Sequence, residues 1–401
     1  MIQIRSPKDC CGCTACAEIC GHGAISMIPD AYGFPYPILD QSKCVDCGMC
    51  DKVCPILNNL RPRYPLVSYA FMHKDQSIRK KSSTAGAFVA LSEKILSKGG
   101  MVFGCAFDTD WSAKHIYVEN KDELAQLVGS KYLQSRIEGS FKDCRSFLRK
   151  GRYVLFSGTP CQIAGLKNYL GKDYDTLLCV DLICHGVPAP RIWQKYLRYR
   201  EQKKSHEVGR KLFVNSVNFR DKSKGWTAYS LSLSLSLSDK SGHIYKEPSL
   251  CWNEDPYMLS FLRHLNMRPS CFQCRFRNQR SGSDITIGDY WGFSEVHPEA
   301  VDDKIGINAL MVNTEKGRTF LDGIDFDGFE SSYEKISYVN IQLVRSHWPH
   351  INLGKFLKKV ETTDDFGDLL TDCLRLSLFK RLLSKARTFY MIYLKHLLYF
   401  L

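Results

Sequence analysis

The sequence predicts an α+β fold, in which a small cysteine-rich domain precedes a mixed α/β body with an antiparallel hairpin and a helical C-terminal tail. Three observations predict it. Nine of the 18 cysteines fall within the first 54 residues. Apolar runs of strand length then alternate with helical patterns, which favours an α/β core. A strict Ser-Leu alternation interrupts that pattern, and period two is typical of a strand with one apolar face.

Each element of the body has its own signal. Two prolines in Arg61–Pro65 indicate a linker after the cysteine-rich segment. Short apolar runs followed by turn residues or helical patterns indicate buried strands. The expected strands are Met101–Phe107, Tyr153–Phe156, Thr176–Ile183 and Asn308–Asn313. Helices are expected after the loop Ser157–Cys161, through Leu170, and over Arg191–Arg200.

The Ser-Leu alternation belongs to an expected hairpin. Lys211–Arg220 and Ala228–Ser238 are extended, and Asp221–Gly225 supplies the turn between them. We interpret this hairpin as structural. The region from Glu361 to the end is expected to be mainly helical.

Composition sets limits on the class of protein. Hydrophobic residues make up 44% and charged residues 24% of the 401 residues, which is ordinary for a globular protein. The formal net charge of +13 suits an acidic partner, an anionic cofactor or an anionic membrane face. No nucleic-acid-binding motif accompanies the charge, so we expect no nucleic-acid partner. Met1–Lys8 has no apolar segment of a secretory signal, and we expect a cytoplasmic protein with reduced thiols.

The end of the chain allows two interpretations. Leu374–Arg387 and Phe389–Leu401 are basic and apolar, but no run reaches the 18 or so apolar residues that a membrane span requires. One interpretation is an amphipathic helix lying on the inner face of the membrane. The other is a terminal helix that packs on the body or on a partner subunit.

Two cysteine runs share one spacing. Cys-x2-Cys-x2-Cys-x3-Cys occurs twice, and the second run continues into Pro55. This is the ligand pattern of a bacterial ferredoxin with two [4Fe–4S] clusters, in which the fourth cysteine of each run ligates the other cluster. The predicted ligands of one cluster are Cys10, Cys13, Cys16 and Cys54, and those of the other are Cys44, Cys47, Cys50 and Cys20. Zinc is the alternative, but zinc sites do not repeat this pattern of quartets. Cys11 is interpreted as a bystander thiol.

Four further cysteines lie in suggestive places. Cys161 and Cys184 each follow a predicted strand, and Cys271-x2-Cys274 lies in a basic, aromatic loop. Ligands that follow successive strands can converge, because sites in α/β sheets lie beyond the carboxyl ends of the strands. Spacing alone leaves a cluster, a zinc site and buried thiols open.

Five sequence blocks, together with the two cysteine runs, resemble the beta-subunit family of coenzyme F420-reducing hydrogenases and F420-dependent dehydrogenases. The resemblance covers about residues 1–340. The blocks are Ser82–Phe88, Gly129–Tyr132, Gly158–Gln162, Asp181–Pro188 and Asp284–Gly292.

The resemblance implies FAD in the body and a third [4Fe–4S] cluster close by. It implies that Cys161, Cys184, Cys271 and Cys274 hold that cluster. It also implies flavin contacts at Ser83, Thr84, Gly86, Lys131, Tyr132, Asp284, Gly288 and Asp289. A Lys near a flavin stabilises its anionic reduced form, and glycine permits close backbone approach. No catalytic residue is assigned.

Four segments are expected: a dicluster ferredoxin domain (1–60), two parts of the flavin-binding body (61–150 and 151–345, the second with the third cluster) and a basic helical tail (346–401). The first functional hypothesis is an oxidoreductase that passes electrons between a hydride carrier at FAD and the clusters. F420 and other substrates, including those of polysaccharide synthesis, remain open. The second hypothesis is an electron-transfer subunit that serves a partner enzyme, and the third is a metal-stabilised scaffold.

Overall fold

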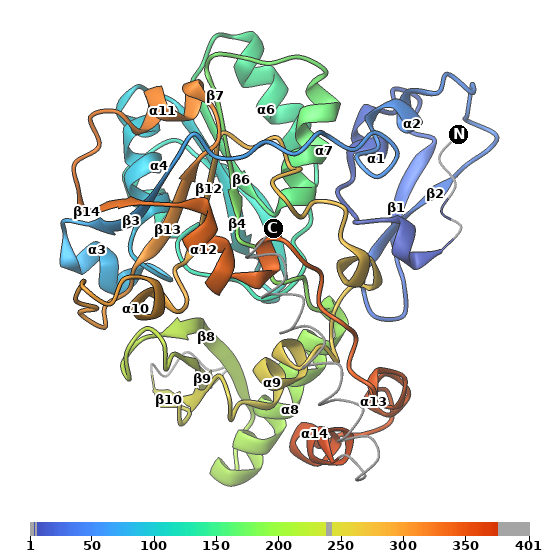
Figure 1. Ribbon diagram of the computed structural model, residues 1–401. Coiled ribbons are helices and arrows are strands. Elements are labelled where there is room, and N and C mark those ends of the chain that lie inside the picture. The colour runs from blue at the N-terminus through green and yellow to red at the C-terminus, as the bar shows by residue number, and fades with distance from the viewer. Residues whose placement is uncertain (1–3, 5, 238–242, 376–401) are drawn as a thin grey trace.

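An eight-stranded mixed sheet forms the centre of the computed structural model, which describes residue 4 and residues 6–237 and 243–375 (Figure 1). The order across the sheet is β14-β3-β13-β12-β7-β6-β4-β5. Its strands are β3 (Val67–His73), β4 (Met101–Phe107), β5 (Ala113–Val118), β6 (Val154–Gly158), β7 (Leu177–Leu182), β12 (Ile285–Asp289), β13 (Asn308–Val312) and β14 (Phe326–Ser331).

The four central strands are parallel to one another. β12 pairs with β7, β7 with β6, and β6 with β4, all in parallel, whereas both edges of the sheet are antiparallel. The carboxyl ends of β4, β6, β7 and β12 therefore meet at one edge of the sheet. That edge is where ligands bind in open α/β sheets.

Helices cover both faces of the sheet (Figure 1). α4 and α11 pack on one face in a core with Val102, Leu155 and Ile285. α6 and α7 pack on the other face against Phe103 and Phe156. The helices of this body are α3 (Gln76–Lys81), α4 (Ala87–Ser97), α5 (Lys121–Leu124), α6 (Ser140–Arg149), α7 (Pro160–Leu170), α10 (Phe293–Val296), α11 (Glu315–Leu321) and α12 (Tyr333–Val339).

A second, four-stranded antiparallel sheet contains the Ser-Leu strand. Leu231, Leu233, Leu235 and Leu237 of that strand are all buried, as the alternation predicts. The expected hairpin is confirmed as β8 pairing with β9, and β10 and β11 add to the other side of β9. The strands are β8 (Leu212–Asp221), β9 (Ser230–Leu237), β10 (Ile244–Lys246) and β11 (Leu250–Cys251).

Four helices share a core with this sheet: α8 (Pro190–Val208), α9 (Pro256–Leu262), α13 (Leu353–Val360) and α14 (Phe366–Leu374). Phe356 of α13 and Phe366 of α14 are buried in that core, together with Trp193 and Tyr196 of α8. The part of the C-terminal region that the structure describes thus packs on the body. The predicted amphipathic segment from Leu374 onward lies almost entirely outside the described residues.

The N-terminal segment repeats one local structure twice. α1 (Ala15–Ile19) begins after Thr14 and α2 (Met49–Val53) after Gly48, and both preceding residues have left-handed backbone angles. Cys20 and Cys54 end the two helices in extended conformation. Between them, β1 (Ile25–Pro29) and β2 (Pro35–Leu39) form an antiparallel pair. The repeated cysteine spacing therefore corresponds to a repeated turn and helix.

Short 3-10 turns complete the described structure: η1 (Pro7–Asp9), η2 (Pro269–Gln273) and η3 (Ile341–Leu343). Within the described residues, no helix is both long and apolar enough to cross a membrane. The α+β class expected from the sequence is confirmed, with α8 running eight residues beyond its predicted end at Arg200.

Candidate functional site: a thiol cavity beside a large pocket

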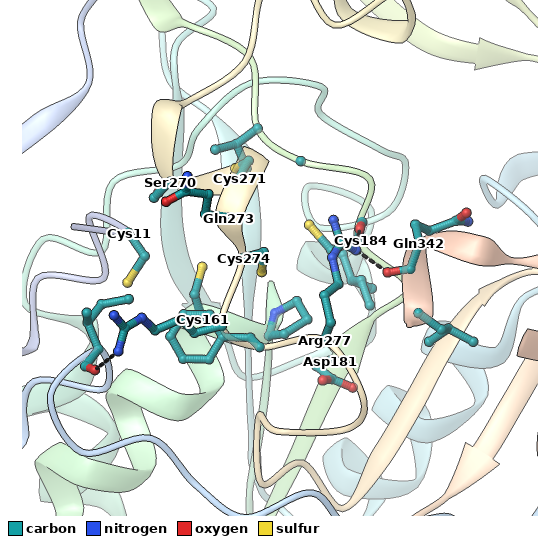
Figure 2. Close-up of a pocket in the computed structure, with 18 of the residues that line it drawn as sticks. Cys11, Cys161, Asp181, Cys184, Ser270, Cys271, Gln273, Cys274, Arg277 and Gln342 are labelled. Atoms are coloured by element: carbon teal, nitrogen blue, oxygen red, sulfur yellow. Dashed lines mark hydrogen bonds between the residues drawn. The ribbon is translucent and has the colours of Figure 1, made fainter. Parts of the chain in front are cut away.

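Five cysteines converge on one small cavity between the N-terminal segment and the sheet. This thiol cavity has a volume of about 50 Å³, and its walls include Cys11, Cys161, Cys184, Cys271 and Cys274. Figure 2 shows these side chains coming from separate parts of the chain. The structure thus brings together all four body cysteines that the sequence singled out, and adds Cys11.

Local structure explains how each body cysteine arrives there. Cys161 lies in the first turn of α7, directly after β6, and a capping box of Thr159 and Gln162 starts that helix. Cys184 follows the neighbouring parallel strand β7. Cys271 and Cys274 lie in and just after η2. Two adjacent strand ends and one turn therefore supply the four thiols.

The four body thiols are half-buried and influence one another electrostatically. Burial raises the pKa of Cys271 to about 12 and raises the pKa of Cys184 and Cys274 as well. Each of these three shifts includes a repulsive contribution from Cys161. Without a metal, such thiols keep their protons. Four thiols gathered in one buried place suit a cationic iron–sulfur core, which would hold them as thiolates.

The N-terminal cysteines fall into two groups that differ in burial. Cys10, Cys13, Cys16 and Cys54 are buried. Burial raises the pKa of Cys16 to about 12, and the charges of Cys10 and Cys54 add to the rise, which places these thiols near one another. Cys20, Cys44, Cys47 and Cys50 are more exposed, and Cys47 is open to solvent.

The interpretation of Cys11 as a bystander does not fit its position. Cys11 is buried, lines the thiol cavity and makes a side-chain hydrogen bond with Cys161. It directly follows Cys10, a predicted ligand of the first ferredoxin cluster. The sequence signal was that adjacency alone, which says nothing about the direction in which a side chain points.

A second, larger pocket opens beyond the carboxyl ends of the central strands. Its volume is about 550 Å³, within the range of small-molecule and cofactor sites. The large pocket shares Cys161, Cys184 and Cys11 with the thiol cavity, so the two adjoin. Tyr229 and Trp291 contribute aromatic walls.

Seven of the eight residues expected to contact a flavin line the large pocket: Ser83, Thr84, Gly86, Lys131, Tyr132, Gly288 and Asp289. Asp284 does not. It lies at the opposite end of β12, where its carboxylate accepts hydrogen bonds from the Cys179 backbone and the Thr314 hydroxyl. Asp284 and Asp289 are separated by the length of the five-residue strand β12. Only the carboxyl end of the block Asp284–Gly292 therefore reaches the pocket.

The loop with Gly86 is held against β12. The side-chain oxygen of Asn308 accepts hydrogen bonds from the backbone amides of Ala85 and Ala87, while its amide donates to the carbonyl of Gly288. Gly86 has φ of 90°, and a Cβ atom there would lie 2.9 Å from Cβ of His73. Glycine is therefore required at this position by both backbone and packing.

A buried arginine that sequence reasoning missed organises the pocket wall. Arg220 of β8 forms an ion pair with Asp289 at 2.9 Å and donates to the Ser83 carbonyl at 3.2 Å. Thr84 donates to the same carboxylate at 2.5 Å. The guanidinium stacks on Tyr229 at 3.9 Å. No motif marked Arg220, because it lies in the segment interpreted as a structural hairpin.

Lys131 contributes a perturbed cation. Burial lowers the pKa of its ammonium group to about 8. The group donates to the carbonyls of Gln126 and Val128, at 3.0 and 3.1 Å. Lys131 therefore places a positive charge at the wall of the large pocket at neutral pH. It loses this charge when the pH rises only slightly above neutral.

Arg268 joins the N-terminal segment to the body. The side chain is completely buried and donates to the carbonyls of Cys10 and Pro35, at 2.8 and 3.0 Å, and to the Gln134 side chain at 2.9 Å. On the other side of the interface α7 comes close: a Cβ atom at Gly165 would lie 2.9 Å from Cβ of Cys13. The N-terminal segment and the body are therefore held in direct contact.

Comparisons with known proteins match two segments of the chain. Residues 9–57 match the family model of the 4Fe-4S dicluster domain, and residues 151–330 match that of the C-terminal part of the coenzyme F420 hydrogenase/dehydrogenase beta subunit. No curated protein matches the chain. Among solved structures, the chain is similar to one from the F420-reducing [NiFe] hydrogenase complex of Methanosarcina barkeri. That similarity has 16% sequence identity and a TM-score of 0.41, and covers 78% of this chain and 91% of that chain.

Proposed function

The chain belongs to the coenzyme F420 hydrogenase/dehydrogenase beta-subunit family and carries a 4Fe-4S dicluster domain at its N-terminus, and on this basis we propose that it is an iron–sulfur flavoprotein oxidoreductase. The observation that carries the proposal is that the large pocket and the thiol cavity adjoin and share Cys161 and Cys184 in their walls. A redox cofactor in the large pocket would lie beside a metal cluster in the thiol cavity.

We assign three [4Fe–4S] clusters to the chain. The two ferredoxin clusters take Cys10, Cys13, Cys16 and Cys54, and Cys20, Cys44, Cys47 and Cys50. The third takes Cys161, Cys184, Cys271 and Cys274. The donor set fits, because four half-buried thiols around one cavity supply the four ligands that such a cluster requires.

We assign FAD to the large pocket, where bound FAD would exchange a hydride with a small-molecule carrier and single electrons with iron–sulfur clusters. The residues fit this cofactor in volume and chemistry. Lys131 lines the pocket and supplies positive charge that would favour an anionic flavin or its phosphates, whereas the charge of Arg220 is paired with Asp289. Asp289 fixes the guanidinium by the ion pair, and Tyr132 and Trp291 give apolar walls that exclude water.

The substrate is a hydride donor or acceptor that reaches the large pocket. We propose a carrier of the F420 type or another small molecule, including one from polysaccharide synthesis, with electrons leaving through the N-terminal clusters to a protein partner.

Iron and flavin content after anaerobic purification tests the proposal. The expected result is about twelve irons and one FAD per chain, since three cubes carry four irons each. Eight irons and no flavin would leave the protein without its proposed active site. Cys161→Ser should remove about four irons and leave the ferredoxin pair, whereas Cys144→Ser, a buried thiol outside the thiol cavity, should remove none. Loss of all iron in Cys161→Ser would contradict the ligand assignment.

A second candidate is an electron-transfer subunit that serves a partner enzyme. It is favoured by exposed apolar side chains on the N-terminal segment, which also carries the solvent-exposed Cys47: Ile28, Ile38, Val45, Met49 and Leu57. Such a surface suits docking of a protein redox partner. The same flavin assay distinguishes the two candidates, because this subunit would bind no FAD and would reduce no hydride carrier by itself.

A further inference from the structure

Three histidines outside the thiol set meet at one point of the fold. His185 follows Cys184 in the loop after β7, His264 follows α9, and His347 follows η3. We call them the histidine trio. The ring centroids of His185 and His347 are 4.0 Å apart, those of His264 and His347 4.4 Å, and those of His185 and His264 5.1 Å. Three connections that are far apart in the sequence therefore each place one imidazole ring at the same point.

The ring nitrogens of the trio are close to one another and unsatisfied. One nitrogen from each ring lies within 4.8 Å of one from each of the others. The Nε2 atoms of all three are buried and have no hydrogen-bond partner among the described residues. Buried polar atoms almost always have partners, so three such atoms in one place indicate a ligand that the protein chain itself does not provide.

The ring of His264 is also oriented by its surroundings. The backbone of Trp348 hydrogen-bonds this ring, and because Nε2 is unpartnered, the contact falls on Nδ1. Histidines that bind metals commonly use their other nitrogen in this way, which fixes the orientation of the ring and leaves Nε2 for the metal. His264 also has a φ of 60°, a conformation uncommon for a residue other than glycine.

We propose that the histidine trio binds one divalent transition-metal ion of the zinc class, with the fourth position open. Imidazole is a preferred ligand for such ions, and three histidines with an open position are typical of catalytic rather than structural zinc sites. Tetrahedral zinc, with N–Zn distances of about 2.0–2.1 Å, holds its nitrogens about 3.3 Å apart, so the trio nitrogens, within 4.8 Å of one another, must draw together by up to about 1.5 Å. Rotation of the three side chains supplies a movement of this size.

The position of the site suggests access from the large pocket. His185 lines that pocket together with Phe261 and Gln342. Two arginines act electrostatically on the trio: Arg263 on His264, and Arg277 on His185 and His347. Arg277 also donates to the carbonyls of Cys184, Gln342 and His185. The charge of both arginines disfavours a neighbouring metal ion. The proposal itself requires neither FAD nor the third cluster.

The test uses the full-length protein with its iron–sulfur clusters, exposed to Zn²⁺ and then freed of loosely bound metal by gel filtration. We expect one zinc per chain beyond the iron. The variants His347→Gln and His264→Gln should lose it at unchanged iron content, whereas His206→Gln, an exposed histidine of α8, should retain it. Zinc retained equally by the trio variants, or absent from the wild type, would overturn the proposal.

X-ray absorption at the zinc edge gives an answer that does not depend on how well the variants fold. The expected spectrum has imidazole nitrogens at about 2.0–2.1 Å and no sulfur shell. Sulfur at about 2.3 Å would show that the zinc has entered a cysteine site instead, and would overturn the assignment to the trio.

Discussion

Replacement of Arg268 by glutamine removes a buried positive charge that lies between two proposed clusters. The guanidinium donates to the carbonyl of Cys10, a proposed ligand of the first ferredoxin cluster. Burial raises the pKa of the thiols of Cys10 and Cys271, and the charge of Arg268 opposes the rise at both. One cation therefore acts on both the ferredoxin cluster and the third cluster, and the variant should affect both.

Coulomb's law gives the size of the effect. For a separation of about 7 Å and an effective dielectric constant of about 20, one unit charge contributes about 2.4 kcal/mol. For a one-electron couple this corresponds to about 100 mV, since a tenfold change in an equilibrium constant is about 59 mV. The reduced cluster carries one more negative charge, so removing the cation destabilises it. Arg268→Gln should lower both potentials by about 50–100 mV, because the glutamine dipole replaces part of the interaction.

Redox titration followed by electron paramagnetic resonance measures these potentials in the anaerobic protein. Arg198→Gln is the control, since this arginine of α8 is exposed and lines neither the thiol cavity nor the large pocket. Its potentials should stay at the wild-type values, because solvent screens an exposed charge. Arg268→Lys keeps the positive charge, so both reduction potentials should stay close to the wild-type values. Unchanged or raised potentials in Arg268→Gln, at full iron content, would refute the electrostatic reasoning.

Three further predictions follow from single side chains. The folded-state pKa of Lys131 is lowered to about 8, so its ammonium charge is lost above that pH. The affinity for FAD should therefore fall as the pH rises through 8. In a fluorescence titration, Lys131→Met should abolish this pH dependence. Burial raises the pKa of Asp181 to about 6, above its unfolded value, so the ionised carboxylate destabilises the fold at neutral pH and stability returns as the pH falls below 6. Asp181→Asn should therefore raise the free energy of unfolding at pH 7 by up to about 3 kcal/mol, but should not raise it at pH 4. Gly165→Ala should destabilise the protein by about 1–3 kcal/mol in thermal unfolding, because the new Cβ meets Cys13, whereas Gly354→Ala, in a helix with open space, should not destabilise it.

Local patterns allowed much of the fold to be predicted from the sequence. Met101–Phe107 is a strand with the bounds that its apolar run suggests, and the repeated cysteine spacing marks two equivalent turns and helices. These features depend on neighbours in sequence. The pairing of β10 and β11 with β9 was not foreseen, because strands of three and two residues carry no periodic signal.

The site was less accessible to sequence reasoning where it depends on contacts across the fold. Arg220 and Arg268 are single arginines in ordinary sequence contexts, and only the tertiary structure shows that each is buried against backbone carbonyls. Asp284 shares a sequence block with Asp289, but the two residues stand at opposite ends of the strand β12. The histidine trio combines residues from three distant connections, which no spacing reveals.

The shared wall of the thiol cavity has a consequence for how the protein is assembled. Lys8, Cys11 and Ile56 of the N-terminal segment close one side of that cavity, and Arg268 fastens this side to the body. Delivery of iron and sulfide to Cys161 and its neighbours should therefore precede the closing of this wall. Maturation would then follow a fixed order, in which the inner cluster is inserted first and docking of the ferredoxin segment seals it from chelators and oxygen.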